Sequence, residues 1–558
     1  MLIGIDVGGT FTDGVLCTAG QILKTAKHPT QESDLQSSIF TVLDDLLQGI
    51  KSGDITQVVL STTLVTNLLA TGGGEQVALV LIPGPGLNLR QLNFFPAAYL
   101  VRGATDFRGR IIEPLDQVQI EEIGKLIVAA GRQKVAVVGK FSQRNSSHER
   151  QVEKILKVNY PHLEVIRGFE VSGQLNFLRR AVTTYYTAVT REKWAGFAAD
   201  IKKAIRERGI TAPLNILKAD GGTMPLEVSL HYPCETVFSG PAASVMGAFA
   251  LTMDQQTSVV VDIGGTTTDL ALILEGEPLY ASRGALIGGY YSHVRSFALR
   301  SMALGGDSAV RWSGEKITIG PDRLGPAACF GGPAATPTDA VNFLEEGKLG
   351  PLALSSHALR KISRQAGLTV EELAQTVVHQ VNSQLETGIK DMFKSWEQEP
   401  AYKIWEIINK RRVGLDRAVG IGAAAGAFVP ALAARLGCQA LVHRYSPVAN
   451  ALGAAVARPT LSLFLHADTE QQTYSLNLEG IAGEFDPGWQ LAEAKELARK
   501  QLQKIAEKRG IGQYADRYEF FLEEQFNMIR GWSTAGKLFD VGVQIASGVI
   551  DEFKGVQP

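Results

Sequence analysis

The chain has 558 residues, of which 45% are hydrophobic and 20% charged, a composition typical of a folded protein with more than one domain. The net charge of −2 and the isoelectric point near 6.5 exclude a strongly basic surface for nucleic acid or an anionic membrane. Four widely separated cysteines form no pair with metal-binding spacing and indicate a reducing, cytoplasmic setting. The apolar stretch 418–434 is rich in Gly and Ala and is too short for a membrane span, so we expect none.

Two stretches of the chain share one pattern. Residues 3–13 (IGIDVGGTFTD) and 259–269 (VVVDIGGTTTD) align without a gap. Each pattern predicts a strand, a tight turn and a second strand. The glycines permit positive φ and let backbone N–H groups approach an anion, and an Asp at a strand end can hold a hydrated divalent cation. One such hairpin could be only a β-turn, but two in the same register favour a two-sided phosphate clamp.

Between and after these hairpins, strands and helices alternate. Apolar residues at helical spacing predict a helix at 34–50, and a long or kinked helix is expected at 171–208 with its charges mostly in solvent. A further apolar helix is predicted to follow Ser239. Short apolar runs predict strands at 58–60, 77–82, 135–138 and 214–217.

The second half of the chain has long irregular segments and a separate tail. Residues 284–338 are rich in Gly and Pro, and long irregular segments inside a domain are often functional. In the tail, strands near 473–478 and 541–549 flank a charged helix at about 489–509, with no signal of chemistry.

Two loops allow a functional and a structural interpretation. Thr62, Thr63 and Asn67 belong to a polar loop that follows the strand at 58–60; they could bind a ligand, or the loop could cap the next helix. Gly420 and Gly422 lie in a glycine-rich strand-to-helix turn at 418–428, which could contact adenine or only allow close packing of helix on strand.

The ordered set of motifs resembles the actin-like ATPase superfamily and, more narrowly, the hydantoinase A/5-oxoprolinase family. The narrower resemblance covers about residues 1–457 and rests on DVGGTFTD, STTLVTNLLA, the 218–223 loop followed by FSGPAASVMGA, VVVDIGGTTTDLAL, LGGDSA, IGPDRLGPAACFG and PTDA. It implies an α/β fold with two ribonuclease H-like halves around a nucleotide cleft and a small C-terminal α+β region. The implied parts are 1–170 with the first hairpin, 171–458 with the second hairpin and the adenosine-side motif, and 459–558 of unknown role.

The resemblance also implies a reaction: ATP- and Mg²⁺-dependent opening of cyclic amides such as hydantoins or 5-oxoproline, with phosphorylation of the ring carbonyl oxygen. A hydantoinase B-like partner subunit would complete the hydrolysis; whether this chain needs one, or forms a homo-oligomer, is left open. Glycines 72–74 replace a charged stretch usual in the family, the chain is shorter than typical members, and its tail does not resemble their C-terminal domain. A small-molecule kinase and an actin-like ATPase that drives a partner protein remain alternatives.

Each motif then receives an expected role. Asp6 and Asp262 would hold Mg²⁺-bound water from opposite sides of the cleft. The phosphates are expected at Gly8, Gly9, Thr10, Gly264, Gly265 and Thr266. The nucleoside is expected beside Gly305, Gly306, Gly420 and Gly422. Thr62, Thr63 and Asn67 would face the substrate, and Asp13 and Asp269 would act as catalytic carboxylates or stabilise their turns.

Overall fold

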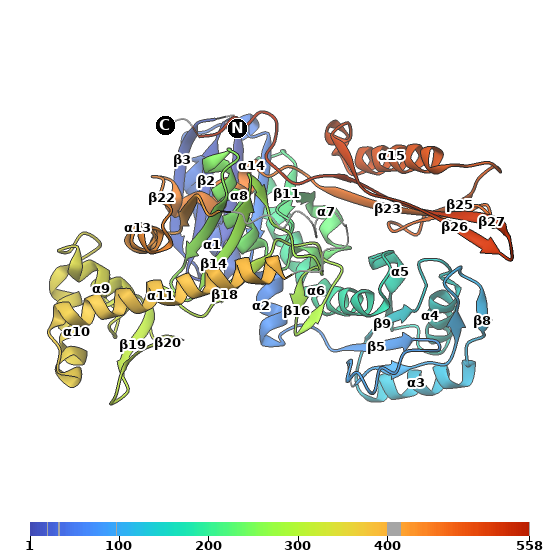
Figure 1. The fold of residues 1–558 in the computed structure, drawn as a ribbon, viewed down its shortest axis with the longest axis horizontal. Coiled ribbons are helices and arrows are strands. Elements are labelled where there is room, and N and C mark those ends of the chain that lie inside the picture. Colours follow the sequence, from blue (N-terminus) through green and yellow to red (C-terminus); the bar gives the residue numbers. More distant parts are fainter. Residues whose placement is uncertain (19, 32–33, 96, 399–413, 557–558) are drawn as a thin grey trace.

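The computed structural model describes residues 1–558 except 19, 32–33, 96, 399–413 and 557–558. Figure 1 shows a central body, a helical arm on one side and two further lobes on the other. The arm contains α9 (Pro337–Leu344), α10 (Leu352–Ala366) and α11 (Val370–Glu397). Within the described ranges, no helix combines the length and the apolar character needed to cross a bilayer.

The first central sheet contains both strands of the first hairpin. Its elements and the helices beside it are β1 (Leu2–Val7), β2 (Phe11–Cys17), β3 (Ile22–Pro29), α1 (Leu35–Leu47), β4 (Gln57–Thr62), α2 (Leu64–Thr71), α6 (Phe177–Glu207), β11 (Leu214–Leu217) and β12 (Thr223–Pro225). The strand order is β12-β11-β4-β1-β2-β3, in which β1, β2 and β3 form an antiparallel meander and β1, β4 and β11 run parallel. Apolar side chains of α1 and α6 cover one face.

The second central sheet repeats this arrangement around the second hairpin. Its elements are β13 (Ser258–Ile263), β14 (Thr268–Leu274), β15 (Glu277–Pro278), β18 (Leu299–Met302), β21 (Arg417–Ile421), α13 (Ala425–Leu436) and β22 (Gln439–Leu441). The order is β15-β14-β13-β21-β22, with β18 also paired to β14, and α11 and α13 cover one face. Two copies of a meander followed by parallel strands confirm the predicted α/β class with two ribonuclease H-like halves. The division of the chain at 170 and 458 stays a prediction; the first sheet includes β11 and β12 from beyond 170.

Two helices made largely of small residues lie between the sheets: α8 (Ser239–Thr252) and α14 (Ala449–Val456). Their side chains join apolar residues of both sheets in one core. They cross at glycines, since a Cβ added to Gly453 would lie 2.3 Å from the backbone nitrogen of Gly247. Strand β1 approaches α14 as closely, because a Cβ at Gly4 would lie 2.0 Å from the carbonyl oxygen of Ala451. These glycines therefore set the spacing of the two halves.

Smaller units surround this body. One lobe is a sheet with its helices, built from β5 (Val77–Ile82), β6 (Tyr99–Leu100), α3 (Gln117–Ala129), β9 (Lys134–Gly139), α4 (Ser147–Asn159) and β10 (Glu164–Arg167). The C-terminal sheet contains β23 (Leu461–Asp468), β24 (Thr473–Leu476), β25 (Ala482–Glu484), α15 (Leu491–Lys508), β26 (Tyr518–Arg530) and β27 (Ser533–Ile545). Short elements between these units are β7 (Ala104–Thr105), β8 (Ile111–Glu113), α5 (Gly168–Val171), α7 (Leu226–Ser229), β16 (Leu286–Ile287), β17 (Tyr290–Tyr291), β19 (Ser308–Trp312) and β20 (Ile317–Arg323).

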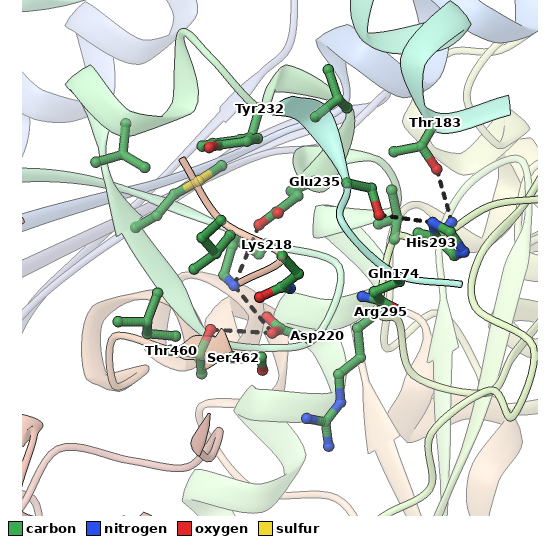
Figure 2. A pocket seen from close by; sticks show the side chains of 18 of the residues that line it. Gln174, Thr183, Lys218, Asp220, Tyr232, Glu235, His293, Arg295, Thr460 and Ser462 are labelled. Atoms are coloured by element: carbon green, nitrogen blue, oxygen red, sulfur yellow. Dashed lines mark hydrogen bonds and ion pairs between the residues drawn. The ribbon is translucent and has the colours of Figure 1, made fainter. Parts of the chain in front are cut away.

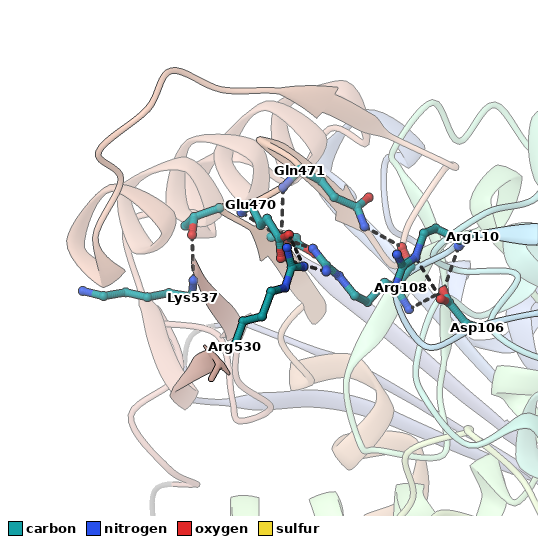
Figure 3. A network of polar contacts seen from close by, with 9 residues as sticks. Asp106, Arg108, Arg110, Glu470, Gln471, Arg530 and Lys537 are labelled. Atoms are coloured by element: carbon teal, nitrogen blue, oxygen red, sulfur yellow. Dashed lines mark hydrogen bonds and ion pairs between the residues drawn. The ribbon is translucent and has the colours of Figure 1, made fainter. Parts of the chain in front are cut away.

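A network of charged side chains joins the C-terminal sheet to the small lobe (Figure 3). Arg108, between β7 and β8, lies 2.9 Å from Asp468 and 2.8 Å from Glu470. Arg530 of β26 contacts the same Glu470 at 2.7 Å. Burial alone would lower the pKa of Arg108, but the two acidic partners outweigh it and raise that pKa. Because removal of Arg108 would leave the buried carboxylate of Asp468 without this ion pair, Arg108 is the residue through which the network connects the C-terminal sheet to the small lobe.

The predicted helix at 171–208 differs from the structure in two respects. Residues 172–176 are not helical, and α6 begins at Phe177, with the Asn176 side chain accepting from the backbone N–H of Arg179. Arg180 is only 1% exposed, so the prediction that it lies in solvent was wrong. Its guanidinium donates to the carbonyl oxygens of Gly139 and Gln174 at 2.7 Å, satisfying the backbone where β9 ends.

The glycine crossing gives a stability prediction. We expect Gly453→Val to lower the free energy of unfolding by about 1–3 kcal/mol or more, because the new side chain must displace backbone atoms of α8. Gly196 in α6 is the matched control: its Cβ position has no atom within 4 Å, so Gly196→Ala should stabilise the protein by about 0.5–1 kcal/mol. Denaturant unfolding measures both variants, and equal effects would contradict the close crossing.

Candidate functional site

The two predicted phosphate hairpins have the same geometry. Asp6 lies directly opposite Asp13 across β1 and β2, and Asp262 lies directly opposite Asp269 across β13 and β14. Residues opposite each other in an antiparallel pair share one face of the sheet. Each hairpin therefore presents two carboxylates together.

The turns of the two hairpins also match. The backbone N–H of Gly8 donates to the carbonyl of Phe11 at 3.0 Å, and that of Gly264 donates to Thr267 at 3.0 Å. The turn glycines do not adopt the positive φ that they permit. They differ in the space around them: a Cβ at Gly265 would lie 2.6 Å from Oδ2 of Asp307, whereas one at Gly9 would meet no atom within 4 Å.

One amide side chain joins the two hairpins. Asn450, near the start of α14, donates from Nδ2 to Oδ2 of Asp6 and to Oδ2 of Asp262, at 3.3 Å in both cases. Ser244 of α8 also donates to Asp262. Neither Asn450 nor Ser244 was predicted as a site residue from the sequence. A single amide in the Ala- and Gly-rich stretch 449–456 is the signal that could have identified Asn450.

Burial controls the charge of these carboxylates. It raises the pKa of Asp6 to about 7, and the nearby Asp13 and Asp262 charges add to this rise. It also raises the pKa of Asp269 to about 7, again with a contribution from Asp262. Asp13 reaches only about 6, because Lys27 donates to it at 2.6 Å and opposes the effect of burial on this pKa. The cluster has more carboxylates than nearby cations, which favours binding of a further cation.

The donor set fits Mg²⁺ better than a metal enclosed by protein ligands. Oδ1 of Asp6 and Oδ1 of Asn450 are buried without a hydrogen-bond partner, as expected for atoms that would face a cation or its water. In the part of the chain that the structure describes, no group of three or more His, Cys, Asp or Glu side chains could hold a metal. Mg²⁺ is usually bound through one or two carboxylates and keeps waters and phosphate oxygens as its other ligands.

A cavity of about 550 Å³ lies between the two hairpin turns. Its lining includes Gly9 of the first turn, Thr266 of the second and Asn67 of α2. The turns approach one another closely, since Oγ1 of Thr10 lies 3.3 Å from the Cβ position of Gly265. The structure thus brings both predicted phosphate-binding turns around one space.

The three predicted substrate-side residues lie in different environments. Asn67 lines the cavity, whereas Thr62 is buried, and its Oγ1 accepts from the backbone N–H of Leu64 at the start of α2. Thr63 is the N-cap residue of α2, without a capping bond from its side chain. Thr62 therefore contributes to the helix start, which is the structural alternative for this loop.

The glycines predicted to lie beside the nucleoside also have different surroundings. Gly306 donates to the carbonyl of Gly264 at 2.9 Å, which holds the loop with Gly305 on the second turn. Gly422 has φ +87° and a Cβ position 2.9 Å from Oδ1 of Asp262. Gly420 is buried under α13, where a Cβ would lie 2.9 Å from that of Ala425, so its position reflects close packing of helix on strand.

A second cavity, of about 100 Å³, lies where β11 ends (Figure 2). Nζ of Lys218 lies 3.2 Å from Asp220 and 3.5 Å from Glu235, and Thr460 donates to Asp220 at 3.1 Å. Burial alone would lower the pKa of Lys218, but the two carboxylates outweigh it and raise that pKa. The ion pairs join the 218–223 loop to Glu235, and the hydrogen bond from Thr460 connects the loop to the start of the C-terminal region.

Comparison with protein families decides the relationship. The hydantoinase/oxoprolinase model matches residues 180–462, and the model of the hydantoinase/oxoprolinase N-terminal region matches residues 2–159. The chain belongs to the hydantoinase/oxoprolinase family. Both central sheets and both hairpins fall within the matched residues.

Other hydantoinase/oxoprolinase proteins are distant in sequence. Caprolactamase subunit alpha of Pseudomonas jessenii is 25% identical over 492 residues, which cover 79% of this chain and 68% of that protein. The uncharacterized protein MJ0964 of Methanocaldococcus jannaschii is 23% identical over 440 residues (70% and 64%), and 5-oxoprolinase of Saccharomyces cerevisiae is 24% identical over 543 residues (82% and 41%). The chain thus spans less than two thirds of MJ0964 and of the yeast protein.

Two solved structures share the fold over nearly the whole chain. Nucleotide-free acetone carboxylase has a TM-score of 0.73 at 18% identity and covers 99% of this chain and 88% of its own. The ATP-dependent caprolactamase of Pseudomonas jessenii has a TM-score of 0.70 at 20% identity, with 97% and 87% covered. These matches include most of the tail after Arg458, which was expected not to resemble the C-terminal domain of the family.

The raised pKa of Asp6 predicts how stability depends on pH. This pKa is about 7 in the folded chain and 3.8 ordinarily, so the folded state binds the proton more tightly and stability falls as pH rises between these values. Without Mg²⁺, Asp6→Asn should raise the free energy of unfolding at pH 8 by on the order of 1–4 kcal/mol and change it little at pH 4. Urea unfolding at both pH values measures this. The exposed control Asp486→Asn should change neither value, and a destabilised Asp6→Asn variant at pH 8 would contradict the assignment.

Proposed function

We propose that this chain is the ATP-using component of an enzyme that opens cyclic amides, and that it transfers the γ-phosphoryl group of ATP to the ring carbonyl oxygen. The observation that carries the proposal is the joining of the two hairpins: Asn450 binds Asp6 and Asp262, and both turns face one cavity. The phosphate chain of ATP needs backbone N–H donors on two sides, which the two turns can supply. It also needs carboxylates close by to hold the metal.

In this proposal the residues have separate roles. Asp6 and Asp262 hold the water shell of Mg²⁺, which neutralises charge on the phosphates. The turns 8–10 and 264–266 bind phosphate oxygens through backbone N–H groups and Thr hydroxyls. The loop with Gly305 and Gly306 and the turn at Gly422 lie beside the nucleoside, and Gly420 acts through packing.

Asp13 and Asp269 are not equivalent as candidate catalytic carboxylates. The cross-strand neighbour of Asp13 on β3 is Lys27, which forms an ion pair with it. The cross-strand neighbour of Asp269 on β18 is Ser301, which supplies no cation. Asp269 is therefore the stronger candidate for proton transfer, and Asp13 for stabilising its turn.

The chemistry explains why ATP is needed. An amide carbonyl is a weak electrophile, and phosphoryl transfer forms a bond from its oxygen to phosphorus as the bond from phosphorus to ADP breaks. Water then adds to the activated carbon, and the ring C–N bond breaks as the nitrogen takes up a proton. A second water converts the acyl phosphate to carboxylate and phosphate. Phosphoryl transfer depends mainly on positioning and charge neutralisation, which this site can supply.

The hydrolytic steps are assigned to a partner. Caprolactamase subunit alpha is, by its name, part of a multi-subunit enzyme. We therefore propose that a hydantoinase B-like subunit completes the reaction and that this chain alone carries out phosphorylation with little ring opening. Full hydrolysis of a cyclic amide by the purified chain would refute this division of work.

The first test of the proposed function is substrate-dependent ADP release. With Mg-ATP and a panel of hydantoins, 5-oxoproline and larger lactams, we expect at least one ring to stimulate ADP release. Asp6→Ala and Asp262→Ala should each reduce that rate at least ~100-fold, because each removes half of the proposed metal shell. Asp486→Ala is the control. ADP release that no cyclic amide stimulates would favour an ATPase that drives a partner protein. A stable phosphorylated product would favour a small-molecule kinase.

The second test uses the space around the turn glycines. Gly9→Val should fold normally, since its Cβ position is open, yet abolish nucleotide binding because Gly9 lines the cavity. Gly265→Val should lose stability as well as binding, because its Cβ would collide with Asp307. Thermal unfolding and calorimetric titration with a non-hydrolysable ATP analogue separate the two effects. Wild-type affinity in Gly9→Val would place the phosphates elsewhere.

A further inference from the structure

Arg323 is the charged residue among the six described residues that line the cavity between the hairpins. It ends β20, which pairs with β19, so it reaches the cavity from outside both central sheets. Gly9, Thr266 and Asn67 line the same space. The loop that contains Arg323 belongs to the IGPDRLGPAACFG motif, to which the proposed function assigns no role.

Asp307 holds this guanidinium against the second hairpin. Nε of Arg323 lies 3.1 Å from Oδ2 of Asp307, and Oδ1 accepts from the backbone N–H of Ala327 at 3.2 Å. The backbone N–H of Asp307 itself donates to the carbonyl of Gly265 at 2.8 Å. A single acidic residue thus connects Arg323, its following loop and the second phosphate turn.

The geometry of this ion pair leaves the terminal nitrogens of Arg323 available. Asp307 is engaged through Nε, and within the described ranges the structure shows no other ion pair of Arg323. The side chain is 29% exposed, so it faces the open cavity rather than the core. The planar terminal amino groups of Arg match two phosphate oxygens at once.

We propose that Arg323 binds the γ-phosphate of ATP and stabilises the charge on the phosphoryl group during transfer, and that Asp307 is the residue that positions it. This inference rests on the proposed function. The γ-phosphate is chosen because Asn67, on the proposed substrate side, shares the cavity with Arg323. The guanidinium therefore lies where the phosphate chain would meet the substrate. A cation in this position supplies the charge stabilisation that phosphoryl transfer requires.

The same β-hairpin offers a matched control. Arg311 of β19 forms an ion pair with Asp322, and both side chains are more than two fifths exposed. It shares the hairpin and the charge with Arg323 and also pairs with an aspartate, through its terminal nitrogens, but it is absent from the cavity lining. Arg311→Ala reports what loss of a surface ion pair on this hairpin does by itself.

The experiment measures the affinities of the full chain for Mg-ADP and for a Mg-bound non-hydrolysable ATP analogue by calorimetric titration. Arg323→Ala should weaken binding of the ATP analogue by about 10- to 100-fold, as expected for loss of a charged hydrogen-bonding group. It should change the affinity for ADP by less than about threefold. Arg323→Lys should retain part of the difference, and Asp307→Asn should show a smaller loss of the same sign. Arg311→Ala should equal the wild type, and thermal unfolding of every variant checks the fold.

Three results would overturn the assignment. Unchanged affinity of Arg323→Ala for the analogue would show that Arg323 does not touch the phosphates. Equal weakening of ADP and analogue would exclude a γ-specific contact. A wild-type chain that binds neither nucleotide would overturn the proposed function together with this inference, whereas the first two results leave ATP use intact.

Discussion

The hydrogen bonds from Asn450 to Asp6 and Asp262 are the contact on which the rest of the site depends. They bring together aspartates 256 positions apart in the printed sequence, from two different sheets. Asp6 is buried and Asp262 half-buried, and desolvation raises the pKa of both, so an apolar residue at 450 would leave them facing each other without this donor. The helix that carries Asn450 lies close to β1 because Gly4 leaves room for the carbonyl oxygen of Ala451.

The two halves repeat one backbone but differ in charge. Lys27 is the cross-strand neighbour of Asp13 in the first half, and Ser301 is the cross-strand neighbour of Asp269 in the second half. The positively charged side chain that lines the cavity, Arg323, belongs to β20, which lies outside both central sheets, and it forms an ion pair with Asp307. Two turns with the same backbone geometry are thus combined with different side chains beside them.

The sequence predicted the features that are encoded locally. The hairpins were predictable because each lies within a dozen residues, and the helix at 34–50 because its apolar residues repeat with helical spacing. Asn450, Ser244 and Arg323 were not identified, because their roles depend on which elements meet in space. Arg180 was assigned to solvent for the same reason: only the tertiary structure shows that β9 ends beside it. Thr62 and Gly420 had both interpretations open; the structure shows Thr62 buried at the start of α2 and Gly420 packed under α13, and contact of either with a ligand stays a prediction.

The crossing of α8 and α14 has a mechanical consequence. At Gly247 and Gly453 the helices touch backbone to backbone, with no side chains interlocked at the point of contact. Translation of one helix along the other would replace a glycine by a larger neighbour and produce a collision, whereas a change of crossing angle keeps the same two glycines in contact. If the cavity opens and closes, we therefore expect a hinge rotation about this point rather than a shear motion.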